Sequence, residues 1–446
     1  MSAAPESPAT DVRAGSNDYP LSRVPQSARY GWFQVAVQRF GQISALSQFL
    51  LGSALGFSMT FWDSFWAITL GAVILELFMI FVGFIGVKEG LNTSILARWV
   101  GFGAAGSAVI GLILALSLIG WFGIQSGVSA AGLTALMPFL PGWAWALIFG
   151  LVVTAVVLKG FLGMQWVANI TVPVFVILVG WAVVAELTKH PVGQLMSEAP
   201  PGDPMPFLGG VTLVAGSFIA GAVITPDMTR YNRTRADVVK QTVVGITLGE
   251  YAVGLSGVLL AHAVKSSDIN NIIMTSVGWV GIIVIVFGTL KINDWNLYSG
   301  GLGIVNFIDT VFHKKVSRPL VTGIIGVIGT ILAAFGILDH FVGFLTLLSV
   351  TFPPIVGIVL AEYFVVKKWR PALDATREAG ALPETSPTWV PATLVIWLAS
   401  SLIAQFVPWG LGAINAVVAA FVLYVVAGKA GLLKSIGESP TEQAVA

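Results

Sequence analysis

The sequence predicts an all-α integral membrane protein with twelve transmembrane helices and a five-plus-five inverted-repeat transporter core. The first reason is composition: 56% of the 446 residues are hydrophobic, 10% are charged, and the mean hydropathy is +0.87. A soluble domain carries about 25% charged residues. The second reason is that the apolar residues group into segments long enough to cross a bilayer. The third is that two of these segments are interrupted at corresponding places in the two halves of the chain.

Twelve apolar segments follow one another when the chain is read with a window of about 20 residues. They lie near 41–60, 65–87, 101–134, 143–158, 164–187, 207–225, 241–264, 273–309, 318–337, 341–366, 389–407 and 410–431. The expected parts are an N-terminal tail over 1–40, a first inverted repeat over 41–187, a second over 207–366, peripheral helices over 389–431 and a C-terminal tail over 432–446.

Basic residues fall on every second loop between these segments. The basic loops carry Lys88 and Arg98, then Lys159, then 230–240, then 313–318, then 367–377. By the positive-inside rule, this alternation predicts that both tails are cytoplasmic and that the protein spans the plasma membrane. The first forty residues lack the short apolar core of a cleavable signal peptide.

Composition also argues against several classes of function. The chain has no cysteine, which excludes disulfides and thiolate catalysis, and its four histidines are too scattered for a metal centre. A net charge of +1 gives no reason to expect nucleic acid as a partner. We therefore expect no enzyme, and we expect a small-molecule substrate and the lipid bilayer as partners. A monomer fits the sequence, which does not fix the oligomeric state.

The first and sixth segments read GQISALSQFLLGSALGFSMT and LGGVTLVAGSFIAGAVITP. Glycine weakens a helix by roughly 1 kcal/mol relative to alanine. Short, glycine-rich segments at matching places in two halves indicate the discontinuous helices of an inverted-repeat transporter. The alternative is that these glycines only permit close helix packing.

Lys291, Asn293, Asp294 and Asn296 lie in the middle of a long apolar run. A central Lys or Asp costs roughly 2.5–3.5 kcal/mol on insertion, so such residues usually line an ion or substrate path. Asp294 could instead pair with Lys291 one helical turn away. Three further acids, Glu76, Glu250 and Glu362, lie in or near apolar runs, and each could pair with Lys291 or Lys159. Glu362 is also close enough to a helix end to be capped or solvated.

Ordered motifs over residues 18–366 resemble the nucleobase:cation symporters, closest to the purine/cytosine permease branch. They are VPQSARYG, WFG, GSFIAG, ITPDMTRYNR, NDWNLYSGGLG and FPPIVGIVLAEYF. The resemblance implies a permease that imports a nucleobase or related small planar nitrogen heterocycle by alternating access, coupled to a cation. It places substrate and ion at the breaks of helices 1 and 6, against helices 3 and 8.

The resemblance also suggests the binding residues. Trp121 and Phe218 match the positions that sandwich the base, which suits a planar ring because stacked rings gain roughly 0.5–1.5 kcal/mol beyond burial. Asn293 is the first choice for the polar edge, since an amide both donates and accepts. Backbone groups freed at the two breaks supply further partners. The complete candidate set is Trp121, Phe218, Ser217, Asn293, Asp294, Gln125, Ala45 and Leu46.

Two positions depart from cytosine permeases. Leu118 stands where they carry Gln, and Ala220 stands where they carry Ser. A ligand group left unpaired costs roughly 1–3 kcal/mol, so cytosine is a doubtful substrate. Gln42, Gln48 and Gln125 could compensate or could form helix–helix hydrogen bonds.

The coupling ion is a second departure. Cytosine permeases carry hydroxyl residues immediately before the Asn-Asp pair, where this chain has Lys291 and Ile292. A lysine ammonium could take the role of sodium or carry a proton itself. The candidate cation-coupling residues are Gly41, Ser44, Lys291 and Asn293, and no cofactor is expected beyond sodium or a proton. Alternatives to a nucleobase permease are an amino-acid or other small polar solute symporter of the same fold, and a non-transporting membrane sensor.

Overall fold

The computed structural model describes residues 19, 22–43, 46–158, 177, 180–181, 184–185, 188–407 and 409–441. Six of the described helices are long and apolar enough to cross a membrane: Phe61–Glu89, Gly103–Leu136, Arg235–Val264, Trp279–Phe312, Ile337–Val366 and Gly412–Lys429. Five shorter apolar helices in the same described ranges accompany them: Leu46–Ser58, Gly142–Leu158, Phe207–Ser217, Arg318–Ala334 and Pro391–Phe406. The architecture is that of a multi-pass membrane protein.

Most of the expected apolar segments contain a described helix, while most of the segment near 164–187 lies outside the described residues. The expected single segment near 273–309 is wrong at its start, because the helices Ile269–Val277 and Trp279–Phe312 are separated at Gly278. The first half contains η1 (Gln26–Ala28), α1 (Trp32–Ile43), α2 (Leu46–Ser58), α3 (Phe61–Glu89), α4 (Thr93–Ala97), α5 (Gly103–Leu136), α6 (Gly142–Leu158) and α8 (Val192–Leu195).

The second half of the chain follows α8. It contains α9 (Phe207–Ser217), α10 (Ile219–Val223), α11 (Thr225–Thr229), α12 (Arg235–Gly249), η2 (Glu250–Leu255), α13 (Ser256–Val264), α14 (Ile269–Val277), α15 (Trp279–Phe312), α16 (Arg318–Ala334), η3 (Ile337–His340), α17 (Phe341–Thr351), α18 (Pro353–Leu360) and η4 (Ala361–Val366). After these come α19 (Arg370–Arg377), β1 (Thr385–Trp389), α20 (Pro391–Phe406), α21 (Gly412–Lys429) and β2 (Ile436–Pro440).

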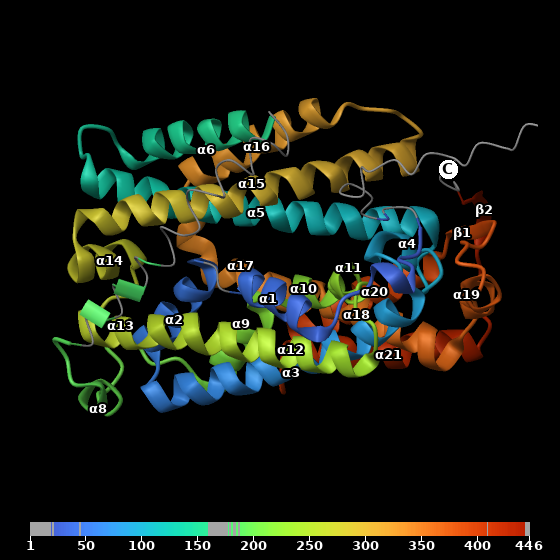
Figure 1. Cartoon of the computed structure of the whole chain (residues 1–446), viewed down its shortest axis with the longest axis horizontal. Coiled ribbons are helices and arrows are strands. Elements are labelled where there is room, and N and C mark those ends of the chain that lie inside the picture. The colour runs from blue at the N-terminus through green and yellow to red at the C-terminus, as the bar shows by residue number, and fades with distance from the viewer. Residues whose placement is uncertain are drawn as a thin grey trace, which may run out of the picture.

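Two layers of helices lie against each other (Figure 1). In one layer, α5 and α15 pack along their lengths, with α6 and α16 beside them. The other layer holds α3, α9 and α12, with α1 packed on α12 and α2 on α13. Helix α17 connects the two layers, because it contacts both α5 and α9.

Glycine sets the spacing between α2 and the helix formed by η2 and α13. A Cβ on Gly52 would overlap the carbonyl of Gly254, and one on Gly56 would lie 2.6 Å from the carbonyl oxygen of Val258. Backbones this close need residues without side chains, as in other membrane interfaces. Gly52 and Gly56 of the first apolar segment therefore serve close packing.

At one end of the bundle, β1 pairs antiparallel with β2, and α19 lies beside them (Figure 1). We call this the strand end. The expected C-terminal tail over 432–446 thus contributes a strand, and α1 begins at Trp32, within the expected N-terminal tail. The early start of α1 was missed because Arg39, which is buried in the structure, lowers the mean hydropathy of this part of the helix.

Candidate functional site

The sixth apolar segment is broken at Phe218, as the glycine pattern predicts. Helix α9 ends at Ser217, and Phe218 has φ −123° and ψ 18° before α10 begins at Ile219. In the first segment, α1 is described up to Ile43 and α2 from Leu46, so the break predicted there falls outside the described residues. Ser44 and Ala45 lie outside the described residues, while Gly41 belongs to the last turn of α1.

Phe218 packs its ring against its own short helix. A Cβ added to Gly221 would overlap the Phe218 ring, so that glycine makes room for it. The ring is half-buried and borders the same hydrophobic cluster as Trp121, a cluster that includes Ile219 and Phe352. The hydroxyl of Ser217 donates to the Val214 carbonyl at 2.7 Å, so this hydrogen bond lies within α9.

Trp121, on α5, is half-buried against aromatic residues of α17. Its ring centroid lies 5.3 Å from that of Phe344 at an interplanar angle of 86°, and 6.1 Å from that of Phe341 at 67°. Gly120 makes room for Phe344, because a Cβ there would lie 2.5 Å from the ring. Phe341 and Phe344 were not predicted from the sequence, although their spacing of three residues in a helix is a detectable signal.

Gln125 lies one turn beyond Trp121, so the two residues share a face of α5. Its side chain is 1% exposed, and its Oε1 atom has no hydrogen-bond partner among the described residues. Leu46, the first described residue of α2, is buried in the same hydrophobic cluster as Ile124. Ile124 directly precedes Gln125 on α5. A buried acceptor of this kind is costly unless a donor reaches it.

Asn293 joins α15 to α5. Its Nδ2 donates to the Phe122 carbonyl at 3.1 Å and to Ser126 Oγ at 3.0 Å, while its Oδ1 accepts from Asn296 Nδ2 at 3.1 Å. The amide is fully buried. In this structure Asn293 therefore fixes the turn of α5 that carries Trp121.

Asp294 is also fully buried on α15. Lys291 belongs to the same helix, but its side chain lies outside the described part of the structure, and so does the proposed contact between the two. One turn before Asn293, Thr289 shares a hydrogen bond with Ser129 of α5. The α5–α15 interface thus contains a row of polar pairs at membrane depth.

The membrane acids also have partners. Glu76 accepts a hydrogen bond from Thr247 at 2.7 Å, and Glu250 accepts one from Gln48. Gln48 thus forms a helix–helix hydrogen bond, one of the two alternatives that the sequence allowed. Glu362 accepts from the backbone N–H of Trp369 at 2.9 Å and from Tyr424 at 3.2 Å, which confirms a capped carboxylate, although a buried one.

Residues 23–429 match the family described as permeases for cytosine/purines, uracil, thiamine and allantoin. The chain belongs to this permease family. It is 30% identical over 366 residues to the cytosine permease of Escherichia coli K12, across 79% of this chain and 82% of that protein. It is 24% identical over 376 residues to the hydantoin permease of Microbacterium maritypicum, across 78% and 74% respectively.

Solved structures show the same fold. The inward-facing conformation of Mhp1 has a TM-score of 0.77 at 19% identity, covering 93% of this permease and 97% of that chain. Mhp1 in a closed conformation with bromovinylhydantoin bound, described as a nucleobase-cation-symport-1 family transporter, has a TM-score of 0.67 at 20% identity, covering 93% and 95%. The permease is therefore a transporter with an Mhp1-like fold, which supports, at the family level, the expectation that it is no enzyme.

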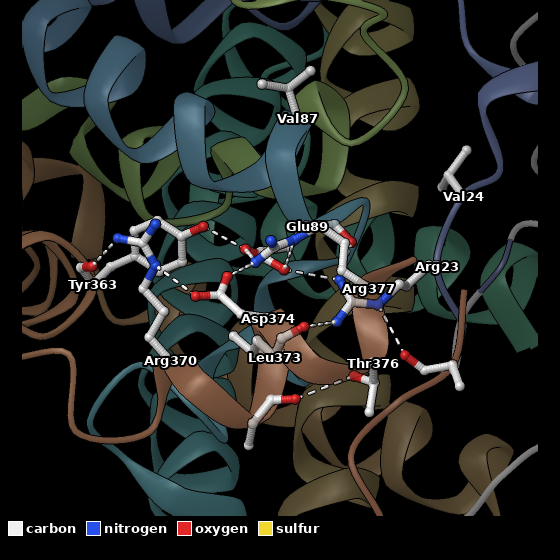
Figure 2. Close-up of polar contacts among 12 residues, drawn as sticks. Arg23, Val24, Val87, Glu89, Tyr363, Arg370, Leu373, Asp374, Thr376 and Arg377 are labelled. Carbon is white, nitrogen blue, oxygen red and sulfur yellow. Dashed lines mark hydrogen bonds and ion pairs between the residues drawn. The ribbon is translucent and has the colours of Figure 1, made fainter. Parts of the chain in front are cut away.

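At its strand end the permease gathers charged residues around Glu89, the last residue of α3 (Figure 2). The Glu89 carboxylate is buried and accepts from Arg23 at 2.8 Å and from Arg377 at 2.7 Å. The Tyr363 hydroxyl of η4 is a third donor. One carboxylate thus joins the N-terminal segment, α3, η4 and α19.

Asp374 is the outer partner in this cluster, where it pairs with Arg377. Burial works against ionisation of both groups, but the hydrogen bond between them lowers the pKa of Asp374, and hydrogen bonds to Glu89 and Asp374 raise the pKa of Arg377.

Asp227 of α11 accepts from the Thr93 backbone N–H at 2.7 Å, and Arg230 donates to the Tyr19 carbonyl at 2.8 Å.

Proposed function

We propose that this permease imports a small, neutral, planar nitrogen heterocycle by alternating access. The observation that carries the proposal is the unpartnered, buried Oε1 of Gln125 on the face of α5 that carries the half-buried Trp121. The pair offers an aromatic surface for stacking and an acceptor for an N–H at the ring edge.

The acceptor narrows the substrate class. A buried acceptor without a partner costs roughly 1–3 kcal/mol, which a ligand N–H recovers when it donates to Gln125. Neutral rings with an amide or ureide N–H, such as nucleobases and hydantoins, have this group. The names of the two relatives, cytosine permease and hydantoin permease, support the same class. Leu118 and Ala220, which offer no side-chain hydrogen bond, favour ureide rings over cytosine.

The break at Phe218 supplies the second wall. Phe218 and Trp121 border one hydrophobic cluster from different helices, and both remain half-buried. Further binding groups in the proposal are the backbone near Ser217, Ala45 and Leu46, with Asn293 and Asp294 at the α15 side. Asn293 contacts the substrate only if it exchanges one of its present hydrogen bonds for one to the ligand.

The finer architecture belongs to the proposal too. The Mhp1-like fold and the alternation of basic loops support twelve transmembrane helices, two inverted repeats of five and cytoplasmic termini in the plasma membrane. Coupling to a cation is proposed on the same ground, since Mhp1 is described as a nucleobase-cation symporter. Lys291, in place of a hydroxyl residue, favours a proton over sodium.

A thermal-shift screen of the purified permease tests the substrate class, because a specific ligand stabilises the folded state by mass action. The panel contains nucleobases, hydantoins, allantoin and amino acids. We expect stabilisation by one or more of the heterocycles and loss of that shift in Gln125→Leu. Stabilisation only by ligands that carry a carboxylate would replace the proposal with an amino-acid carrier. Tight heterocycle binding without uptake into liposomes would indicate a sensor.

A further inference from the structure

Glu250 is a carboxyl group buried at the centre of a membrane span. The helix Arg235–Val264 is 30 residues long, and Glu250 lies near its middle, at the first position of η2, a turn of π-helix. Its side chain is fully buried. A charge at this depth is costly, and π-helical turns inside α-helices occur often at functional sites.

The carboxyl group has only part of the hydrogen bonding that an ionised form needs. Oε2 accepts from Gln48 Nε2, while Oε1 has no hydrogen-bond partner within the described ranges. Among the described residues, no lysine, arginine or histidine forms an ion pair with Glu250. A buried carboxylate without a countercharge is expected to bind a proton.

The groups on the surrounding elements reinforce this expectation. Helix α3 presents a second carboxyl, Glu76, which interacts electrostatically with Glu250, and α2 carries no titratable residue. The ionisable residues of α12 are confined to its first two turns, where Asp237 caps the helix. On α13, His262 contacts the Met59 carbonyl at the other end of the span, and Tyr251 of η2 bonds to Thr69. On α1, Arg39 lies against Gly245 and donates to Gln241 of α12. Of all these groups, the one that interacts electrostatically with Glu250 is Glu76, another acid.

We propose that Glu250 is a proton-binding site of this permease, with Gln48 as its hydrogen-bond partner. The proposal rests on the proposed function only where it makes the proton the coupling ion. Binding converts the carboxylate to a carboxylic acid without breaking any other bond, and release returns the proton. The Gln48 amide can serve both states, since its N–H donates to the carboxylate and its oxygen accepts from the acid O–H.

Gln48 connects the proton site to the described start of α2. It lies two residues after Leu46, where α2 is described to begin, and its Nε2 also lies against Gly254 of η2. A change in the protonation of Glu250 therefore reorients a side chain at the start of α2. This contact is the route by which proton binding would affect the proposed substrate site, which includes the backbone at Leu46.

Infrared pH titration of the purified permease tests the site with the proton itself as the ligand. We expect the carbonyl band of a buried carboxylic acid in the wild type, loss of this band in Glu250→Gln, and its retention in the matched control Glu76→Gln. If Glu250→Gln does not fold, Gln48→Leu takes its place, and removal of the hydrogen bond must shift the band. A band that persists unchanged in Glu250→Gln, or unshifted in Gln48→Leu, overturns the proposal.

Proteoliposome uptake separates this inference from the proposed function, with radiolabelled allantoin and uracil as probes. An outside pH about one unit lower, at zero membrane potential, allows up to about tenfold accumulation at one proton per substrate. We expect accumulation in the wild type and in Glu76→Gln, and only exchange in Glu250→Gln. Accumulation by Glu250→Gln equal to the wild type overturns the coupling role. No uptake of either probe by the wild type would count against the proposed function, while the infrared band would still decide the proton site.

Discussion

The side-chain amide of Asn293 donates a hydrogen bond to the backbone carbonyl of Phe122 at 3.1 Å. This contact fixes α15 against the turn of α5 that carries Trp121, so Asn293 sets the position of the proposed stacking wall. Gln125, on the same turn, has an Oε1 atom that no described residue contacts. The structure thus distinguishes two amides that look alike in sequence. Asn293 holds two helices together, and Gln125 offers a free acceptor atom.

Substitution of the two amides should therefore have different effects. Asn293→Ala removes hydrogen bonds to Phe122 and Ser126, and we expect it to lower both stability and ligand affinity by about 1–3 kcal/mol. Gln125→Leu removes a buried atom without a partner, so affinity should fall while stability is unchanged or increased. Calorimetric binding and thermal unfolding of both variants measure this. Equal affinity of Gln125→Leu and wild type would remove Gln125 from the site.

The aromatic walls give a second prediction. Trp121→Ala and Phe218→Ala should each abolish uptake while leaving the protein folded and inserted. Loss of a stacking partner costs about 1–3 kcal/mol per base, which is roughly a 5- to 150-fold loss of affinity. Trp121→Phe, which keeps an aromatic face, is the matched control. Wild-type transport by both alanine variants would show that the site lies elsewhere.

The sequence predicted the helix spans and the break at Phe218, because hydropathy and glycine content act locally. It did not predict the Glu89 cluster, whose partners Arg23, Tyr363 and Arg377 come from distant parts of the chain. Nor did it predict the β1–β2 pair, since Pro387 and the polar residues of 436–440 suggest loops. Pairing of such strands depends on the bundle end against which they pack.

The candidate site was also only partly predictable from the sequence. Residue types and the family resemblance suggested Trp121, Phe218 and Gln125, and their roles stay predictions. Both amides offer a donor and an acceptor, and Asn293 was favoured over Gln125 as the polar edge because the resemblance matches it to the Asn-Asp pair of the family. Which amide is already engaged by Phe122 and Ser126 depends on how α5 and α15 pack, and only the structure shows this.

The Glu89 cluster predicts a large difference between neighbouring acids. Glu89→Ala leaves the guanidinium groups of Arg23 and Arg377 without their buried partner, and breaking such a pair costs about 3–5 kcal/mol. Asp374→Ala removes a pair whose acid is 44% exposed, so the expected cost is at most about 1 kcal/mol. Thermal unfolding in detergent compares the two. Similar losses of stability would contradict a central role for Glu89.

The pH dependence of Asp374 follows from the direction of its pKa. Its hydrogen bond with Arg377 outweighs the opposing effect of burial and lowers the pKa in the folded state, so its contribution is complete above the ordinary value of about 3.9 and is lost at more acid pH. The stability difference between wild type and Asp374→Asn should then stay constant from about pH 8 to pH 5. A difference that shrinks across this window would place the ionisation of Asp374 at higher pH.

Lys291 leads to a prediction about sodium. A lysine stands where cytosine permeases carry hydroxyl residues, and two unit charges about 4 Å apart repel by roughly 4 kcal/mol at an effective dielectric of 20. Uptake in proteoliposomes should therefore be unchanged when choline replaces sodium. Lys291→Gln tests whether the lysine also carries a proton, in which case accumulation falls to exchange. A steep dependence of wild-type uptake on sodium would restore sodium symport.

Equilibrium binding by titration calorimetry tests most directly whether the Trp121–Gln125 face of α5 holds a planar nitrogen heterocycle. The panel is nucleobases, hydantoins, allantoin and amino acids, titrated into wild type, Trp121→Ala and Gln125→Leu. We predict that a neutral heterocycle binds the wild type and that each substitution weakens this binding by about tenfold, or roughly 1.4 kcal/mol. Heterocycle affinity that is the same in all three proteins would contradict the account.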